Sequence, residues 1–238
     1  MPLNDAFENE PPPPSAETVA RRALILSGIV CRGFMEREAD GAQTVAKVKN
    51  WFHALDIESY LSEWERQVLH TPVGQLSRRD EINASWLSEG LVVLAWALGK
   101  SSLPSFDAQC NPGEMAATLD FLLPKESTAL NHPILLSTVD LEDYNNFIYN
   151  LHWRVRRFSL NRQPYDFKSL AQKAWGEPVA RHGVAFAEDD LALNGVPLAK
   201  TEETAWRTLE SIVRERHRAS NWLIGYASED FYEVTTDT

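Results

Sequence analysis

Apolar residues recur at helical spacing through most of this sequence, and residues typical of helix ends separate one run from the next. Ser62 is followed three residues later by Glu65, the capping-box pattern in which each side chain satisfies a free backbone donor. Ser77 and Asp80 form a similar pair, and Ser15 stands before the first apolar run. The apolar residues of that run lie about one turn apart: Val19, Ala23, Leu26, Val30 and Phe34. These patterns predict a mainly α protein.

Signals of this kind divide the chain into eight predicted helices. They begin after Ser15, near Gly41, and after Ser62, Ser77 and Asn111, and continue at 140–158, 167–175 and 202–224. Gly99 is expected to end the fourth helix, because glycine adopts the left-handed conformation of a helix C-terminus without strain. Pro112 suits the first turn of the fifth helix, whose apolar residues predict that it extends to Leu122.

One segment departs from helical spacing. Asn194 and Gly195 lie between two short apolar runs, and this dipeptide supplies the positive φ values of a two-residue hairpin turn. Pro197 has no N–H to donate, so its strand is expected at an edge. The acidic residues Glu188, Asp189 and Asp190 are expected to form a solvated turn before the hairpin.

The domain organisation follows from length and composition. Residues 1–14 are acidic and end in four prolines, whose rings fix φ and remove N–H donors, so we predict a disordered tail. The remaining residues, 15–238, have the length of one domain. We therefore expect a mainly α, single-domain helical bundle with one small β-hairpin near 190–198.

The composition favours a cytoplasmic location. The two cysteines, Cys31 and Cys110, have no second cysteine at metal-ligand spacing, which favours free thiols in a reducing compartment. The N-terminus has neither the basic region nor the apolar core of a secretory signal. The longest apolar stretch, at 91–99, is too short to span a bilayer.

The formal net charge of −11 argues against a general affinity for nucleic acid or anionic membranes, because both require clustered positive charge. The charge is compatible with a basic protein partner, although many acidic proteins have none. The six histidines are scattered, and no two lie one helical turn apart. No metal and no cofactor is therefore expected.

Three predicted helices each turn ionisable side chains toward the core. Glu89 lies within an apolar arc that is formed by Ile82, Trp86, Val93 and Ala97. His152 lies on the apolar arc of the helix predicted at 140–158. Arg216 and His217 lie on the apolar arc of the last predicted helix.

Two interpretations of these four residues remain open. A buried charge is costly unless it is paired, and we expect the planar guanidinium of Arg216 to pair with Glu89. The cluster is then a structural brace, a set of polar contacts that fixes the register of the helices. Alternatively it is a polar pocket between helices, where His152 or His217 moves protons near neutral pH and Glu89 orients them.

Structural roles are expected for four tryptophans: Trp86, Trp96, Trp153 and Trp222. Trp222 points away from the apolar arc of the last helix, where it would be exposed without a cover. The sequence offers such a cover in the apolar residues near its end, Phe231, Tyr232 and Val234. We predict that this closing segment folds back over Trp222.

Four segments together carry a family likeness: 85–99 (SWLSEGLVVLAWALG), 140–157 (DLEDYNNFIYNLHWRVRR), 215–226 (ERHRASNWLIGY) and 229–238 (EDFYEVTTDT). In combination they resemble the bacterial domain-of-unknown-function family 4272, over most of the chain from about residue 15. The resemblance implies a mainly helical single domain and no activity. Leu87 replaces an arginine of the family pattern, so no role of that arginine transfers, and Phe231 and Tyr232 stand where a tryptophan is usual.

Two function classes follow. The first is a non-catalytic, cytoplasmic protein-interaction protein, immunity-like or regulatory, that binds a basic partner through its acidic surface. The net charge and the lack of a nucleophile with an adjacent base favour it. The second is a small-ligand binder or an enzyme that uses the cluster of Glu89, His152, Arg216 and His217.

Overall fold

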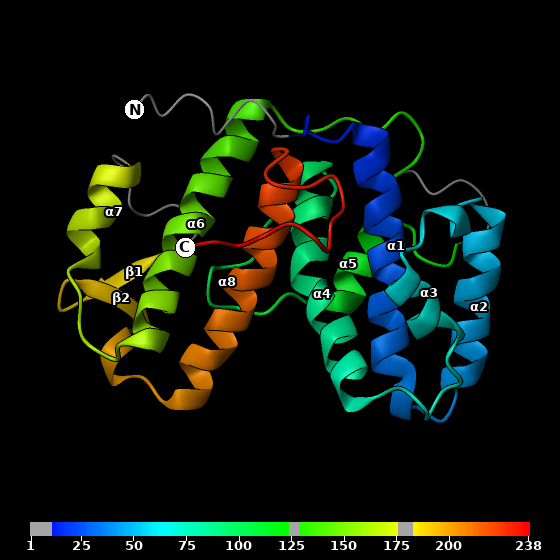
Figure 1. Ribbon diagram of the computed structural model, residues 1–238, viewed down its shortest axis with the longest axis horizontal. Helices are drawn as coiled ribbons and strands as arrows, with labels where there is room; N and C mark the ends of the chain where they lie inside the picture. The colour runs from blue at the N-terminus through cyan, green and yellow to red at the C-terminus, as the bar shows by residue number, and fades with distance from the viewer. Residues whose placement is uncertain (1–10, 124–128, 176–182) are drawn as a thin grey trace. The chain divides into compact units, whose positions relative to one another are not determined.

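The computed structural model describes residues 11–123, 129–175 and 183–238, which form two compact units (Figure 1). The N-terminal unit consists of Ser15–Ser102 and Cys110–Leu136. The C-terminal unit consists of Met1–Pro14, Leu103–Gln109 and Ser137–Thr238. The mainly α fold with a small antiparallel sheet is confirmed. The expectation that 15–238 form one domain stays a prediction.

In its described residues, the regular secondary structure of the N-terminal unit is all helical. Its helices are α1 (Ala16–Phe34), η1 (Met35–Arg37), α2 (Gly41–Ala54), η2 (Glu58–Tyr60), α3 (Glu63–His70), α4 (Arg78–Ala97) and α5 (Pro112–Thr118). Helices α1 and α4 lie side by side, and α2 and α3 lie on the other side of α1 (Figure 1). Gly33 allows this approach, because a Cβ atom there would lie 2.9 Å from the Cβ of Ala84.

The predicted helix caps are present. Ser15, Ser62 and Ser77 each accept a hydrogen bond from a backbone N–H in the first turn, and Ser62 and Glu65 form the complete capping box. Gly99 has a φ of +67° after α4, as predicted for a helix end. Local sequence signals therefore set most helix boundaries in this unit.

Two details of the predicted helices are wrong. Helix α5 ends at Thr118 and does not reach Leu122, which has a φ of +62°. The arc predicted for α4 fails at its start, where Ile82 is 38% exposed and Trp86 is half-buried. The reason is that α4 is buried on all sides from Leu87 to Ala95, and such a helix has no single apolar face to read.

The C-terminal unit pairs two long helices with a small sheet. Its elements are α6 (Thr138–Leu160), α7 (Phe167–Trp175), β1 (Ala185–Ala187), β2 (Asp190–Leu193), β3 (Val196–Pro197), η4 (Leu198–Lys200) and α8 (Glu203–Leu223). Helices α6 and α8 pack side by side and run antiparallel (Figure 1). The ring of Phe158, near the end of α6, packs edge-on against that of Trp206, near the start of α8, at 5.6 Å.

The hairpin is confirmed and is part of a three-stranded antiparallel sheet in the order β1-β2-β3. Asn194 and Gly195 form the turn with φ values of +50° and +78°, and Pro197 lies on the edge strand β3. Strand β1 was not predicted. Its turn to β2 uses positive φ values at Glu188 and Asp189 without a glycine.

The solvated turn predicted at 188–190 is therefore wrong at its last residue. Asp190 belongs to β2 and is only 1% exposed. Its carboxylate can be buried because it pairs with Arg154 of α6.

The closing segment covers Trp222 as predicted. Trp222 is 3% exposed, and its ring packs edge-on against Phe231 with centroids 5.6 Å apart. Its indole N–H donates to the carbonyl of Glu229 at 2.9 Å, and the Asn221 amide donates to the carbonyl of Thr235 at 2.9 Å. These bonds fix the path of the segment over the end of α8.

Residues 11–14 lie against the same end of the C-terminal unit. Gly225 follows α8 with a φ of +78°, and a Cβ atom there would lie 2.4 Å from the carbonyl oxygen of Pro11. Residues 1–10 of the predicted tail lie outside the described residues. In the described ranges, no helix is both long and apolar enough to cross a membrane.

Candidate functional site

Two of the four predicted site residues meet inside the C-terminal unit. His152 of α6 and His217 of α8 are 4% and 1% exposed, and their Nδ1 atoms lie 2.9 Å apart. One Nδ1 must carry the hydrogen and the other must accept it. Tyr149 packs edge-on against the ring of His217, with centroids 5.6 Å apart. The pair thus bridges the two long helices.

The surroundings of the two rings keep both neutral. Burial lowers the pKa of His152 to about 4, with a smaller contribution from the positive charges of Arg214 and Arg156. The pKa of His217 falls to about 3, first because of burial and then because of His152, while a hydrogen bond with Asn221 acts in the opposite direction. Burial thus opposes protonation of either ring near pH 7, and the choice between a brace and a pocket stays a prediction.

The third predicted residue, Arg216, organises a segment of its own unit. Its side chain is 1% exposed and donates to the carbonyl oxygens of Ser105 at 3.0 Å and Ala108 at 2.7 Å. These charge-assisted bonds fasten residues 103–109 to α8. Arg216 therefore has a structural task whatever other partners it has.

The fourth predicted residue, Glu89, lies on α4 in the N-terminal unit and is 1% exposed. Its carboxylate accepts a hydrogen bond of 2.9 Å from the backbone N–H of Cys110, directly before the cap of α5. Glu89 and Arg216 belong to different units, so their pairing stays a prediction.

Sequence reasoning missed a buried ion pair in the C-terminal unit. Arg154 of α6 is fully buried and donates to both carboxylate oxygens of Asp190, from Nε at 2.7 Å and from the terminal nitrogen at 2.5 Å. Asp190 also accepts from the backbone N–H of Tyr165 at 3.3 Å and of Leu191 at 2.8 Å. The helical spacing could have indicated that Arg154 faces the core, because Arg154 lies within one turn of Leu151, a buried residue of the same helix.

A second pair, also missed, lies in the N-terminal unit. Arg32 is fully buried, pairs with Glu36 at 2.6 Å and donates to the carbonyl oxygens of Thr71 at 3.0 Å and Pro72 at 3.2 Å. Glu36 in turn accepts from the backbone N–H of Leu76 at 2.7 Å. Buried arginines thus recur in this protein as anchors of loop backbone.

The four tryptophans differ in burial. Trp86 and Trp96 are half-buried in α4, and Trp222 is buried under the closing segment. Trp153 is half-buried, and its ring meets that of Tyr165 edge-on at 5.4 Å. Within the described part of the chain, no group of three or more His, Cys, Asp or Glu side chains is arranged to hold a metal ion.

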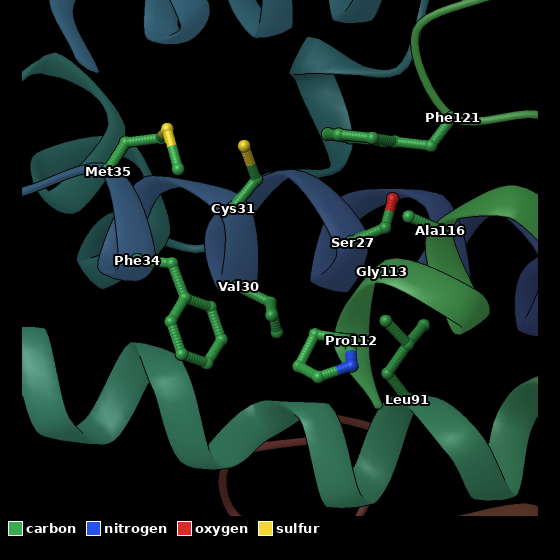
Figure 2. Close-up of a pocket in the computed structure, with 10 residues that line it drawn as sticks. All are labelled: Ser27, Val30, Cys31, Phe34, Met35, Leu91, Pro112, Gly113, Ala116 and Phe121. Atoms are coloured by element: carbon green, nitrogen blue, oxygen red, sulfur yellow. The ribbon is translucent and has the colours of Figure 1, made fainter. Parts of the chain in front are cut away.

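A pocket that the sequence did not predict lies in the N-terminal unit (Figure 2). It has a volume of about 440 Å³. Its walls come from α1, η1, α4, α5 and the turn that follows α5. The lining residues are Ser27, Val30, Cys31, Phe34, Met35, Leu91, Pro112, Gly113, Ala116 and Phe121. Phe34, the last residue of the first apolar run, is 47% exposed at this pocket, which helical spacing alone did not predict.

Comparison with protein families matches residues 2–176 to a domain of unknown function, DUF4272. The segments 85–99 and 140–157, which carry the family likeness, lie within this match, whereas 215–226 and 229–238 follow it. No curated protein and no solved structure matches the chain. Because the family match covers more than half of the sequence, the chain belongs to the family DUF4272.

Proposed function

We propose that this protein is a non-catalytic interaction protein of the bacterial cytoplasm, and that it binds a basic protein partner through one end of the C-terminal unit. We call this surface the acidic end. It comprises the exposed carboxylates of the first turns of α6 and of the closing segment: Asp140, Glu142, Asp143, Glu229, Asp230, Glu233 and Asp237. This gathering of acidic side chains is the observation that carries the proposal.

Hydrogen bonds between α6, α8 and the closing segment support the view that the two groups of carboxylates share one end of the helix pair. The Asn145 amide of α6 donates to Ser220 at 3.0 Å and to Asn221 at 2.7 Å on α8. Asn221 then donates to the carbonyl of Thr235 in the closing segment. The backbone that carries the acidic residues is therefore held in place before any partner arrives, which lowers the entropic cost of binding.

The segments that carry the acidic end are acidic throughout. The segments 137–153 and 219–238 contain no lysine and no arginine. A one-signed surface attracts a partner of opposite charge, speeds its association and makes the complex sensitive to salt. A basic protein partner fits this surface best.

The core contacts also favour binding over catalysis. His152 and His217 bond to each other as neutral rings, and Arg154 is held by Asp190. Each of these groups supports the packing of α6 against a neighbour. The brace interpretation of the ionisable core is thus the one we adopt.

The test compares two fourfold variants of the full chain, each immobilised and exposed to a lysate of its own host at low and high salt. The acidic-end variant carries E229Q, D230N, E233Q and D237N, which keep hydrogen-bonding capacity. The control carries E38Q, D40N, D56N and E63Q, four exposed acidic residues of the N-terminal unit.

We expect a basic protein to be retained by the wild type and by the control, to elute with salt, and to be lost from the acidic-end variant. Equal retention by both variants would assign the interaction to another surface. Retention of no basic protein by the wild type contradicts the proposal.

A further inference from the structure

We infer that the pocket of the N-terminal unit binds an uncharged aromatic or alicyclic small molecule. The inference is independent of the acidic end, which belongs to the other unit. Sites for small molecules have volumes of about 300–1,000 Å³, and the 440 Å³ of this pocket falls in that range. Since one water takes up about 30 Å³, the pocket suits a ligand of roughly fifteen non-hydrogen atoms.

The walls of the pocket are almost free of polar groups. Among the lining residues, only Ser27 and Cys31 carry a side-chain hydroxyl or thiol. The Ser27 hydroxyl already donates to the carbonyl oxygen of Leu24 at 2.7 Å, so it can only accept a further hydrogen bond. A ligand therefore finds one hydroxyl acceptor and one weakly polar thiol, and it gains most from apolar contact.

The pocket also lacks charge. Burial raises the pKa of the Cys31 thiol to about 11, and the nearby positive charge of Arg32 offsets this only in part. The thiol is neutral at pH 7, and the lining contains no Asp, Glu, Lys, Arg or His. A charged ligand would lose its hydration without gaining a counter-charge, which excludes carboxylates and amines whose charged group must enter the pocket.

Two phenyl rings are among the lining side chains, and each offers an aromatic surface to a ring-containing ligand. Figure 2 shows Phe34 projecting from α1 toward α4, next to Val30 and facing Pro112 of α5, with Phe121 beyond the other side of α1. The ring of Phe121 is fixed by edge-on packing against Trp51, with centroids 5.1 Å apart. Phe34 is 47% exposed, more than is usual for a phenylalanine that has its full set of neighbours.

The occupant is identified as a small molecule because of the shape and source of the walls. The pocket is bounded by four helices and one turn of a single unit. It is small enough that a larger side chain in place of Ala116 would fill part of it. A second copy of the chain would need a complementary apolar projection; dimerisation is therefore one outcome of the test.

The experiment uses the full chain and two probes with the same ring system. N-phenyl-1-naphthylamine is uncharged and fluoresces in apolar surroundings, and 8-anilinonaphthalene-1-sulfonate adds one negative charge. We expect saturable binding of the uncharged probe and at least tenfold weaker binding of the sulfonate. Equal affinities of the two probes would overturn the assignment of the ligand class.

Variants locate the binding. Ala116→Phe fills the pocket and should weaken binding of the uncharged probe at least tenfold, whereas Ala117→Phe, at the exposed next position of α5, should leave it unchanged. Binding that is absent in the wild type, or equal in both variants, overturns the proposal. So does a wild-type dimer that Ala116→Phe abolishes, since the occupant would then be a second copy.

A further pair of measurements decides the matter if Ala116→Phe does not fold. Phe34→Ala removes a half-exposed part of the wall and should weaken binding of the uncharged probe severalfold. Saturating probe should also slow the labelling of Cys31 by N-ethylmaleimide at least tenfold in the wild type, as measured by peptide mass. Unchanged affinity and unchanged labelling would place the probe elsewhere.

Discussion

The Nδ1 atoms of His152 and His217 lie 2.9 Å apart between α6 and α8, and this bond requires that the accepting ring be unprotonated. Both rings are buried, and both have pKa values below the ordinary value of a histidine. The contact that joins the two long helices is therefore one that acid breaks.

Acid is expected to destabilise the C-terminal unit. The folded-state pKa values of about 4 and about 3 lie below the ordinary 6.5, so the unfolded chain binds more protons than the folded chain below pH 6.5. The free energy of unfolding should fall from pH 6.5 toward pH 4, by about 1.4 kcal/mol per pH unit for each histidine that stays neutral in the fold. Urea unfolding at pH 7, 6 and 5 measures this slope.

Two variants assign the slope to the pair. His152→Gln removes one titrating ring and keeps a hydrogen-bonding group beside His217, so it should reduce the slope by about half. His70→Gln changes an exposed histidine of the N-terminal unit and should leave the slope as it is. The same slope in all three proteins would contradict the assignment.

The buried pair of Arg154 and Asp190 should contribute strongly to stability. Asp190→Asn deprives a fully buried guanidinium of its counter-charge, and breaking a buried pair in this way costs about 3–5 kcal/mol. Equilibrium unfolding in urea measures the loss. Glu188→Gln is the control, because Glu188 pairs with Lys200 on the surface nearby, and it should change little. A similar loss of stability in both variants would show that the buried pair contributes no more to stability than the surface pair.

Removing the closing segment should expose Trp222. Deletion of 229–238 takes away the ring of Phe231 and the acceptor of the indole N–H, and truncating a buried aromatic residue alone costs about 3–5 kcal/mol. We expect a lower thermal midpoint and a red-shifted tryptophan emission. The fourfold acidic-end variant retains Phe231 and should keep both properties; an unchanged midpoint in the deletion variant would refute the structural role of the segment.

Arg216→Lys should loosen residues 103–109. A lysine cannot reach the carbonyls of both Ser105 and Ala108, so at least one bond to a charged donor is lost, at a cost of about 2 kcal/mol. Hydrogen exchange at 105–109 should speed up. Arg214→Lys, on the half-exposed side of the same helix, should leave that exchange unchanged.

The parts of the fold that sequence predicted are those set by neighbours along the chain. Ser62 and Glu65 cap a helix from three residues apart, and Asn194-Gly195 makes its turn alone. Strand β1 was not predicted because its turn at Glu188 and Asp189 lacks the glycine that is typical of such turns. A three-residue strand gives no alternation to read.

The candidate site was predicted only as far as helical spacing allows. The spacing placed His152 and His217 on apolar faces, but it could not show that the rings meet across sixty-five positions of sequence. Asp190 was taken for a surface residue because its partner, Arg154, lies on another element. The pocket was missed because it arises where α1, α5 and Phe121 leave space between them, and no local pattern encodes a space.

The route of the chain through the two units bears on how the protein is made. All residues of the N-terminal unit precede Ser137, so that unit can leave the ribosome complete before α8 has been synthesised. The prolines that lie against Gly225 are translated more than two hundred residues before the glycine itself. The C-terminal unit therefore closes on its N-terminal segment only after Gly225 has been made, and a nascent chain must keep that segment available until then.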